Sequence, residues 1–330
     1  MLETLRRLTE ITAPSGCEGL LYDTIRAELA GYADEITADA LGSLIVHKRG
    51  SGKRVMFSAH IDEIGVMATY IADGGFVSFA NIGGVNPYYA LAQRVRFTNG
   101  AVGVIGADIS SEDTMKKLKI SDLYIDLGVS TREEAEKLVS VGDCAGFIGG
   151  LVTAGDCAVS KSMDDRAGCA VLIEAIKRIG EHENDLYFVF SYGEELGLRG
   201  AGAAAFSIEP DFGVAVDVTR TGDCPGKLKM AVSLGGGAAV KIKDSSVMCH
   251  PYIKKLMCDT AEKYGIKYQL EVLEEGGTDA GSIHLSRGGV PSGCISVPTR
   301  YIHSPSEMIN LKDLDDCAEL AAKLCEVGFR

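Results

Sequence analysis

The feature that most constrains the fold is an alternation between short apolar runs, each ending in polar residues, and stretches of helical periodicity. VMFSA precedes His60 and Asp62, LYFVFS precedes Glu194 and Glu195, and CISV precedes a loop that holds His303. Apolar runs of this kind, bounded by Gly or Pro, are typical of buried strands, so the alternation predicts a mixed, largely parallel sheet flanked by helices. Ligands of such sheets collect at the carboxyl edge, where these polar residues would lie.

Further carboxylates are expected at the same edge. Asp217 ends the run FGVAVDV, and Asp164 and Asp165 form an acidic doublet in SKSMDDRAG. Strand alternation would point His60 and Asp62 to the same side. Taken alone, the doublet could merely place negative charge at the first turn of a helix, and the His-x-Asp pair could be an ordinary surface pair. The hypothesis of a functional site depends on the joint occurrence of these groups.

Composition excludes several classes of function. The 330 residues include 33 Lys and Arg against 46 Asp and Glu, a net charge of −13 without a basic stripe, so no nucleic-acid partner is expected. No apolar stretch reaches about 18 residues and MLETLRRLTEI is charged, so we expect a cytoplasmic protein without a membrane partner. The ten cysteines lack a C-x-x-C pair and are expected to be reduced core residues.

The length suggests about two domains, and a change in the pattern of predicted helices and strands indicates where they divide. From about residue 66, strand-like runs punctuated by Gly, Asn and Asp follow one another, which predicts a small barrel or sandwich. Helix and strand patterns alternate again after Ser160. We therefore predict one domain formed by residues 1–65 and 160–330, with residues 66–159 inserted in it as a β-rich domain.

Shorter patterns predict individual elements. Two helices flank the APSG turn and a hairpin precedes the His60 strand, while TREEAEKLV predicts a helix capped by Thr131. Further helices are predicted near residues 250–264 and 279–287 and over LKDLDDCAELAAKLCEVG. LGGGAA lacks the Lys-Ser/Thr ending of a phosphate loop and is expected to be a bend between strands.

The predicted site has the ligand types of a divalent metal centre. Imidazoles and carboxylates without clustered thiols suit zinc, cobalt or manganese. The set is too large for one open catalytic ion, so two ions that share a carboxylate are expected. Two dications would balance Asp164, Glu195, Asp217 and one hydroxide, which favours burial. One member of the pair Glu194 and Glu195 would remain free as a general base.

With these residues identified, the chain resembles the dinuclear-metal aminopeptidases of the TET and glutamyl-aminopeptidase family over nearly its whole length. The segments that carry the resemblance are SAHIDEIGVMA, SMDDRAG, GEELGLRGA, VAVDVTRTGDCPG and GGTDAGSIHLSRGGVPSGCISVPTRYIHSPSEMI. The resemblance implies a zinc-peptidase fold with an inserted small β-barrel that serves dimerisation. It also implies a homo-oligomer, a dodecamer built from dimers, that removes amino-terminal residues from short peptides.

The resemblance further implies a role for each candidate residue. His60 and Asp217 would bind one ion, Asp164 would bridge both, and Glu195 and His303 would complete the second. Glu194 would be the general base, and Asp62 would orient His60 from behind.

Alternatives remain open from the sequence. A related metal amidohydrolase, either a deacylase or a carboxypeptidase, could use the same core, and a non-catalytic oligomeric scaffold could retain a metal site. A cellulase is not expected, because the chain has no Trp to form a sugar platform. Arg220 could face an acidic substrate, although a pairing with Asp223 or with a neighbouring subunit is the preferred interpretation. The preferred amino-terminal residue, the physiological metal and the extent of assembly are not determined by the sequence.

Overall fold

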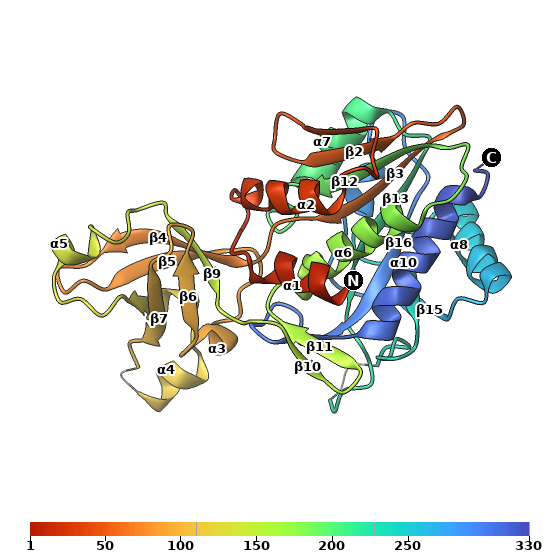
Figure 1. Cartoon of the computed structure of the whole chain (residues 1–330). Helices are drawn as coiled ribbons and strands as arrows, with labels where there is room; N and C mark the ends of the chain where they lie inside the picture. Colours follow the sequence, from red (N-terminus) through yellow and green to blue (C-terminus); the bar gives the residue numbers. More distant parts are fainter. Residues whose placement is uncertain (110, 227–228, 330) are drawn as a thin grey trace.

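The computed structural model describes residues 1–109, 111–226 and 229–329. Figure 1 shows an α/β body with a smaller β-rich lobe standing to one side of it. The body contains an eleven-stranded sheet, and the lobe is a closed barrel. The predicted fold class, a mixed sheet flanked by helices with an inserted small barrel, is confirmed.

The bounds of the elements are as follows. The strands of the body are β1 (Glu35–Ala38), β2 (Leu44–Lys48), β3 (Arg54–His60), β10 (Val152–Ala154), β11 (Cys157–Ser160), β12 (Asp185–Ser191), β13 (Phe212–Thr219), β14 (Ala238–Lys243), β15 (Tyr268–Val272), β16 (Ser292–Arg300) and β17 (Glu307–Asn310). The strands of the barrel are β4 (Gly65–Ile71), β5 (Val77–Ile82), β6 (Arg94–Phe97), β7 (Val102–Ala107), β8 (Leu123–Asp126) and β9 (Cys144–Phe147). The helices are α1 (Leu2–Glu10), α2 (Tyr22–Glu28), α3 (Pro87–Ala90), α4 (Glu112–Lys116), α5 (Arg132–Ala135), α6 (Met163–Arg178), α7 (Arg199–Ile208), α8 (Pro251–Tyr264), α9 (Ala280–Ile283) and α10 (Leu311–Glu326), with 3₁₀ turns at Glu18–Leu21 and Ile120–Asp122.

The centre of the sheet is parallel. β12, β3, β13 and β16 lie side by side in that order and run in the same direction, so their carboxyl ends meet at one edge. Antiparallel strands extend the sheet on both sides. On one side, the hairpin of β1 and β2 lies beyond β12. On the other side, β17, β11 and β10 follow β16 in that order. The register places Ser191 beside His60 and Asp217 beside Ser296, which fixes the relative heights of the site residues.

Helices cover both faces of the sheet, and strand alternation decides which side chains each face receives. Val55 and Phe57 of β3 belong to the core cluster beneath α1, α6 and α10, whereas Met56 packs in the cluster beneath α7 and α9. All three side chains are fully buried. Each contributes about 1.5–3 kcal/mol by leaving water, so this core holds rigid the strands that carry the site.

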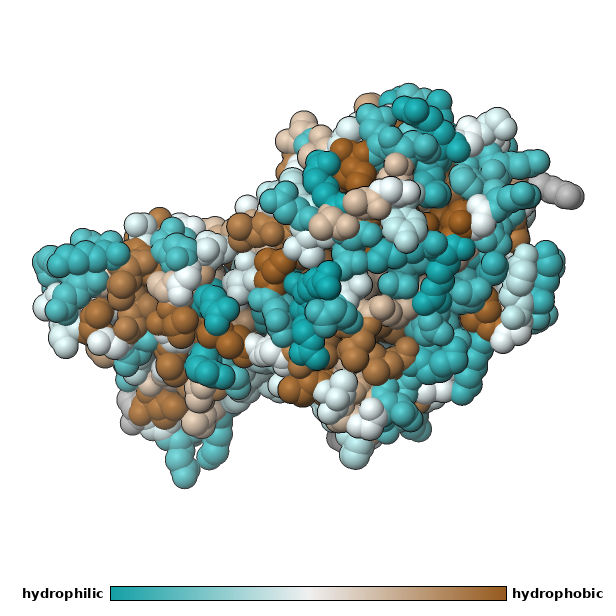
Figure 2. All heavy atoms as spheres, in the orientation of Figure 1, coloured by the Kyte–Doolittle hydropathy of each residue, from teal (hydrophilic) through white to brown (hydrophobic). Residues whose placement is uncertain are grey.

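The barrel follows β3 directly in the chain. Its strands are ordered β4-β5-β8-β7-β6-β9, and its interior is apolar, with Val66, Val95, Phe97 and Ile125 almost fully buried. Val102 and Val104 of β7 are exposed on the outer surface, and Figure 2 shows apolar residues gathered over this lobe. β10 and most of β11 lie within residues 152–159, which the sequence analysis grouped with the insertion, but both strands belong to the large sheet. The exact domain limits stay a prediction.

The individual element predictions are largely confirmed. The hairpin of β1 and β2, helix α8 and the terminal helix α10 lie where the patterns placed them, and Thr131 caps α5 by accepting a hydrogen bond from the Glu134 amide. The predicted helix at 279–287 was too long, since α9 ends at Ile283. The left-handed backbone of Arg287 (φ 51°) turns the chain there towards β16. Among the described residues, no helix is long and apolar enough to cross a membrane.

Candidate metal centre

Two imidazoles meet one carboxylate at the carboxyl edge of the sheet. His60 is the last residue of β3 and is 2% exposed. Its Nε2 lies 2.9 Å from Asp164 Oδ1, while His303 Nε2 lies 3.3 Å from Asp164 Oδ2 and 3.1 Å from Glu195 Oε1. Asp164 thus presents one oxygen to each histidine. This is the arrangement expected of a ligand shared between two neighbouring ions.

The start of α6 positions the acidic doublet. Asp164 (φ −78°, ψ 105°) and Asp165 (φ −119°, ψ 40°) are not helical, so the regular helix begins only after them and both side chains turn towards the sheet. Asp165 Oδ2 accepts a hydrogen bond from the His60 amide (3.2 Å), and its Oδ1 accepts one from the Gly168 amide (2.9 Å). Asp165 is therefore anchored to backbone, which suits a supporting role better than that of a shared ligand.

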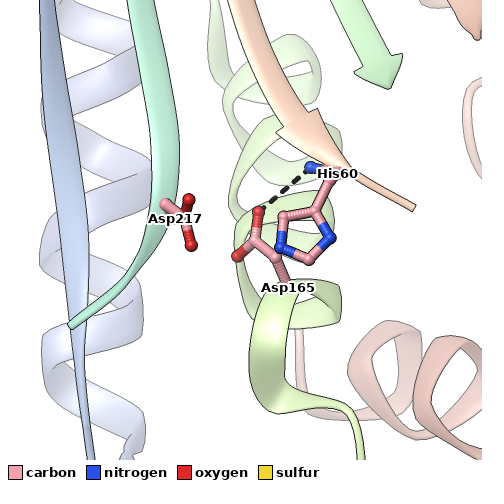
Figure 3. Close-up of side chains that lie close together, drawn as sticks. All are labelled: His60, Asp165 and Asp217. Carbon is pink, nitrogen blue, oxygen red and sulfur yellow. Dashed lines mark hydrogen bonds between the residues drawn. The ribbon is translucent and has the colours of Figure 1, made fainter. Parts of the chain in front are cut away.

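Figure 3 shows His60, Asp165 and Asp217 facing a common space from three different elements. Ligand atoms of these three residues lie within 4.8 Å of one another, and so do those of His60, Asp164 and Glu195. His60 belongs to both groups. The sequence analysis placed Asp165 at this edge as a member of the acidic doublet but assigned a ligand role to Asp164 alone.

Asp62 lies behind His60, but not through strand alternation. β3 ends at His60, and the loop that follows places Asp62 Oδ1 3.3 Å from His60 Nδ1. The same carboxylate accepts hydrogen bonds from the amides of Glu194 (3.1 Å) and Glu195 (3.2 Å) and from Ser15 Oγ (2.6 Å). Asp62 therefore connects the His60 loop to the loop that carries both glutamates.

Glu194 lies beside the cluster rather than between the histidines. Its Oε2 is 3.9 Å from His60 Nε2. Burial and the charge of Asp217 raise the pKa of Glu194 well above its usual value, although His60 acts in the opposite direction. A carboxyl group with a raised pKa can hold and release a proton near neutral pH. The role of Glu194 as a general base stays a prediction, with which this position and environment agree.

Burial and mutual repulsion act on the other carboxyl groups too. Burial is the main reason why the pKa values of Asp165 and Asp217 are raised, and the charge of Asp217 adds to the effect on Asp165. Glu195 Oε1 is buried, and its only ion-pair contact among the described residues is with His303 Nε2, at 3.1 Å. The pocket thus holds more negative charge than its own side chains neutralise. Carboxylate oxygens and imidazole nitrogens are the ligands of divalent cations such as zinc, and an excess of negative charge favours binding of such cations.

Neighbouring carboxylates raise the pKa values of both histidines in spite of their burial. Although burial alone would lower the pKa of both, the charge of Glu194 raises that of His60 well above its usual value. Hydrogen bonds with Asp164 and Glu195 raise the pKa of His303 to about 11. Conversely, burial would raise the pKa of Asp164, but hydrogen bonds from His303 and His60 hold it below its usual range.

Glu307 on β17 supports the site and was not predicted from the sequence. Its Oε2 accepts a hydrogen bond from the Asp164 amide (2.9 Å) and its Oε1 accepts one from the His303 amide (2.8 Å). Burial raises the pKa of Glu307 to about 8. One carboxyl group therefore sets the distance between the backbones of two candidate ligands. Only its place in the segment PTRYIHSPSEMI could have drawn attention to it.

Asp279 supports the opposite side of the site. Its Oδ2 accepts hydrogen bonds from Ser58 Oγ on β3 and from Ser191 Oγ on β12, both at 2.6 Å. Ser191 lies beside His60 in the sheet register. Asp279 therefore connects the end regions of the two strands that precede the His60 loop and the glutamate loop. No local sequence pattern predicts this contact.

The barrel touches the candidate ligands through two glycines after β5. A Cβ atom on Gly84 would lie 2.5 Å from His303 Nδ1, and one on Gly83 would lie 2.5 Å from Glu195 Oε2. Real Cβ atoms do not approach other heavy atoms so closely, so only glycine allows this loop to pass. The inserted barrel thus forms part of the wall of the site.

A cavity of about 180 Å³ opens onto the cluster. Its polar lining residues are His60, Asp164, Glu194, Glu195, Asp217, Thr219, Arg220, Glu275 and His303. A neighbouring hollow of about 390 Å³ shares Arg220, Ile302 and His303 with it and is bounded on the barrel side by Gly84 and Tyr89. The six residues proposed from the sequence as ligands or base all line the cavity, and Asp62 lies beneath it.

The preferred interpretation of Arg220 is wrong in one respect. Asp223 pairs with Arg300 instead, at 2.6 Å between Arg300 Nη2 and Asp223 Oδ2. Arg300 ends β16 and is distant in sequence, so the sequence could not reveal the competition. Of the other histidines, His47 forms a hydrogen bond with Asp185 and His250 caps α8, so both have structural roles away from the cluster.

An α/β fold that gathers imidazoles and carboxylates at the carboxyl edge of its sheet has the features of a hydrolase of the metallopeptidase class. The family model described as M42 glutamyl aminopeptidase matches residues 42–320. The chain therefore belongs to the M42 glutamyl aminopeptidase family, and the resemblance drawn from the motifs is confirmed.

Individual relatives agree with this assignment. The chain is 35% identical to a lysyl aminopeptidase from Pyrococcus furiosus over 98% of this chain and 96% of the relative. It superimposes on an aminopeptidase from Desulfurococcus kamchatkensis with a TM-score of 0.94 at 37% identity, covering 98% and 94% of the two chains. For the TET1 peptidase of Pyrococcus horikoshii, which can assemble into a tetrahedron or a large octahedral shell, the TM-score is 0.87 at 32% identity, covering 98% and 99%.

Proposed function

We propose that the protein is a dinuclear metalloaminopeptidase that removes amino-terminal residues from short peptides. The observation that carries the proposal is Asp164, whose two carboxylate oxygens face His60 and His303 separately. His60 and Asp217 would hold one ion, Glu195 and His303 would hold the other, and Asp164 would contribute to both. Zinc, cobalt or manganese suits this donor set.

Each candidate site residue has a defined part in the proposed reaction. When bound, a pair of divalent cations lowers the pKa of water towards about 7 and polarises a carbonyl. Glu194 accepts the proton of the attacking water and passes it to the leaving amine. Asp62 keeps His60 and the Glu194 loop in register through its contacts with both. The cavity of about 180 Å³ has room for the end of a peptide chain but not for a folded domain, which supports a short peptide as the substrate.

We also propose that the protein assembles as a homo-oligomer built from dimers, up to a dodecamer, in the cytoplasm. Support comes from the assembly of the related TET1 peptidase and from the exposed apolar residues Val102 and Val104 on the barrel. The inserted residues 66–159 are the proposed dimerisation domain.

The experiment that tests the function compares aminoacyl-anilides with the same compounds acetylated at the amine, in the presence of zinc, cobalt or manganese. We expect hydrolysis of the free-amine series, loss of activity in a chelator and no hydrolysis of the acetylated series. Faster hydrolysis of the acetylated series would instead indicate a deacylase. Absence of any chelator-sensitive hydrolysis would leave only a non-catalytic scaffold.

A further inference from the structure

Arg220 occupies a position that the proposed reaction does not use. It follows β13 directly, three residues after Asp217, and lines both the cavity at the cluster and the neighbouring hollow. Its side chain is 55% exposed. A guanidinium therefore stands at the junction between the candidate ligands and the space where the rest of a substrate would lie.

The contacts of Arg220 leave its guanidinium available. Its ion-pair contact is with Glu275 at 3.8 Å, and the Glu275 side chain is 83% exposed. Such a distant and solvated pair contributes little and is readily replaced. By contrast, Arg300 is held to Asp223 by two contacts, Nη2 to Oδ2 at 2.6 Å and Nε to Oδ1 at 3.3 Å. The two arginines line the same hollow, but only Arg300 has its donors committed to a carboxylate.

With cations bound, the cavity has no surplus of negative charge that would repel an anionic partner. Asp164, Glu194, Glu195, Asp217 and Glu275 line it, and two divalent cations together with Arg220 would balance these five carboxylates. When the solvent-exposed Glu275 is displaced, the guanidinium of Arg220 is left to pair with a carboxylate of the substrate. A planar guanidinium matches a carboxylate in geometry as well as charge, because two parallel N–H donors can meet its two oxygens.

We infer that Arg220 binds a carboxylate of the substrate and makes the protein selective for peptides that carry one near the scissile bond. The inference rests on the proposed function. A side-chain carboxylate of the amino-terminal residue and the carboxy-terminal carboxylate of a dipeptide present the same chemistry at this position. Glu275 competes weakly for the guanidinium and is displaced by the substrate group.

The test compares Arg220→Met with wild type on two pairs of substrates that differ by one charge. Glu-anilide against Gln-anilide reports on the side chain, and Leu-Leu against Leu-Leu-amide reports on the carboxy terminus. In at least one pair we expect the wild type to prefer the charged member in kcat/KM by roughly 10-fold, the value of one charge-assisted pair at a partly exposed site. Arg220→Met should reduce this ratio to about one. The pair that responds identifies the source of the carboxylate.

Two further variants separate local recognition from general electrostatics. Lys229 lines an adjoining hollow together with Arg220 but is not in the lining of the metal cavity, so Lys229→Met removes the same charge nearby and should retain the ratio. Glu275→Gln removes the competing carboxylate and should lower the KM for the charged member. An equal loss of the ratio in Arg220→Met and Lys229→Met would overturn the inference, and so would a wild type without preference in either pair.

A binding measurement keeps the inference separate from the proposed function. Calorimetric titration of metal-loaded protein with L-glutamate and L-glutamine, and of its Glu194→Gln variant with Leu-Leu and Leu-Leu-amide, needs no turnover. The charged member of one pair should bind about 10-fold more tightly, and Arg220→Met should abolish this difference. Retention of the difference in Arg220→Met would overturn the inference even if the enzyme were active, while an inactive wild type with the expected difference would refute only the proposed function.

Discussion

The body and the barrel differ in the kind of side chains that they bury. Buried polar and charged side chains are concentrated in the body, including His60, Asp165 and Glu307, whereas the described part of the barrel between Gly65 and Phe147 has none. Burying charge is costly unless it is paired or binds a cation. The body thus accepts a cost in stability where the site lies, while the barrel depends on apolar burial. The barrel nevertheless contributes the glycine loop that encloses the site.

The largest expected effect lies in the body, at the residue that faces both histidines. Asp164→Ala should lose bound divalent metal and hydrolytic activity together, because within the described part of the chain only this carboxylate contacts both His60 and His303. Metal content measured by plasma mass spectrometry, alongside the anilide assay, checks this. A variant that retains activity without metal would break the account of the site.

Glu194→Gln should separate metal binding from turnover. The amide keeps the size of the side chain but cannot shuttle a proton, so kcat should fall by roughly 10³-fold while the metal content stays near that of the wild type. Glu112→Gln, on an exposed side chain of the barrel, is the matched control and should leave kcat unchanged. Near-normal turnover in Glu194→Gln would remove the residue from its proposed role.

The parts of this site that the sequence could and could not predict differ in physical kind. His60, Glu194 and Asp217 were predictable because each follows or ends an apolar run, and local periodicity specifies strands. Glu307 and Asp279 act through hydrogen bonds to the backbone or to serines of distant strands, so their roles exist only once the sheet has formed.

The same limit applies to charge pairing and to the barrel. Asp223 was expected to be a partner of Arg220, but Arg300 reaches it from β16 with better geometry. The fold class and the insertion were predictable from the change in helix and strand patterns along the chain. The close approach of Gly84 to His303 was not predictable, because the sequence of a Gly-Gly turn does not indicate which residue packs against it.

Gly84→Ala tests whether the barrel is part of the site. Its new methyl would lie 2.5 Å from His303 Nδ1, and the ring could yield only by leaving its place beside Asp164. We expect kcat/KM to fall by roughly 10- to 100-fold, as for other displacements of about 1 Å near reacting groups. Gly288→Ala, where a Cβ would meet nothing within 4 Å, is the control. Equal activity of both variants would indicate that the barrel is merely adjacent.

Phe97→Ala tests the apolar basis of the barrel. The ring is 1% exposed, so its removal should lower the free energy of unfolding of the barrel by about 3–5 kcal/mol, measured by urea denaturation. Phe76→Ala, on a ring that is 42% exposed, should cost about 1 kcal/mol or less. Similar losses for both would contradict the assignment of the barrel core.

The smallest effect concerns an ion pair of the body. Lys177 Nζ lies 2.6 Å from Glu28 Oε2, and although burial alone would raise the pKa of Glu28, Lys177 and Arg7 lower it from 4.5. Because the pKa of Glu28 is lower in the folded state, its ion pair stabilises the fold above about pH 4.5. This stabilisation is lost as the pH falls through the folded-state pKa of Glu28. Glu28→Gln should therefore lower stability by about 1 kcal/mol at pH 7, with the difference disappearing in acid. A pH-independent difference would contradict this.

The central claim is that side chains from distant parts of the chain hold two neighbouring cations with Asp164 between them. Anomalous diffraction from crystals soaked with zinc or cobalt tests it most directly. We predict two peaks about 3.5–4 Å apart, one beside His60 and Asp217 and one beside His303 and Glu195. Peaks elsewhere, or none at this edge of the sheet, would contradict the account.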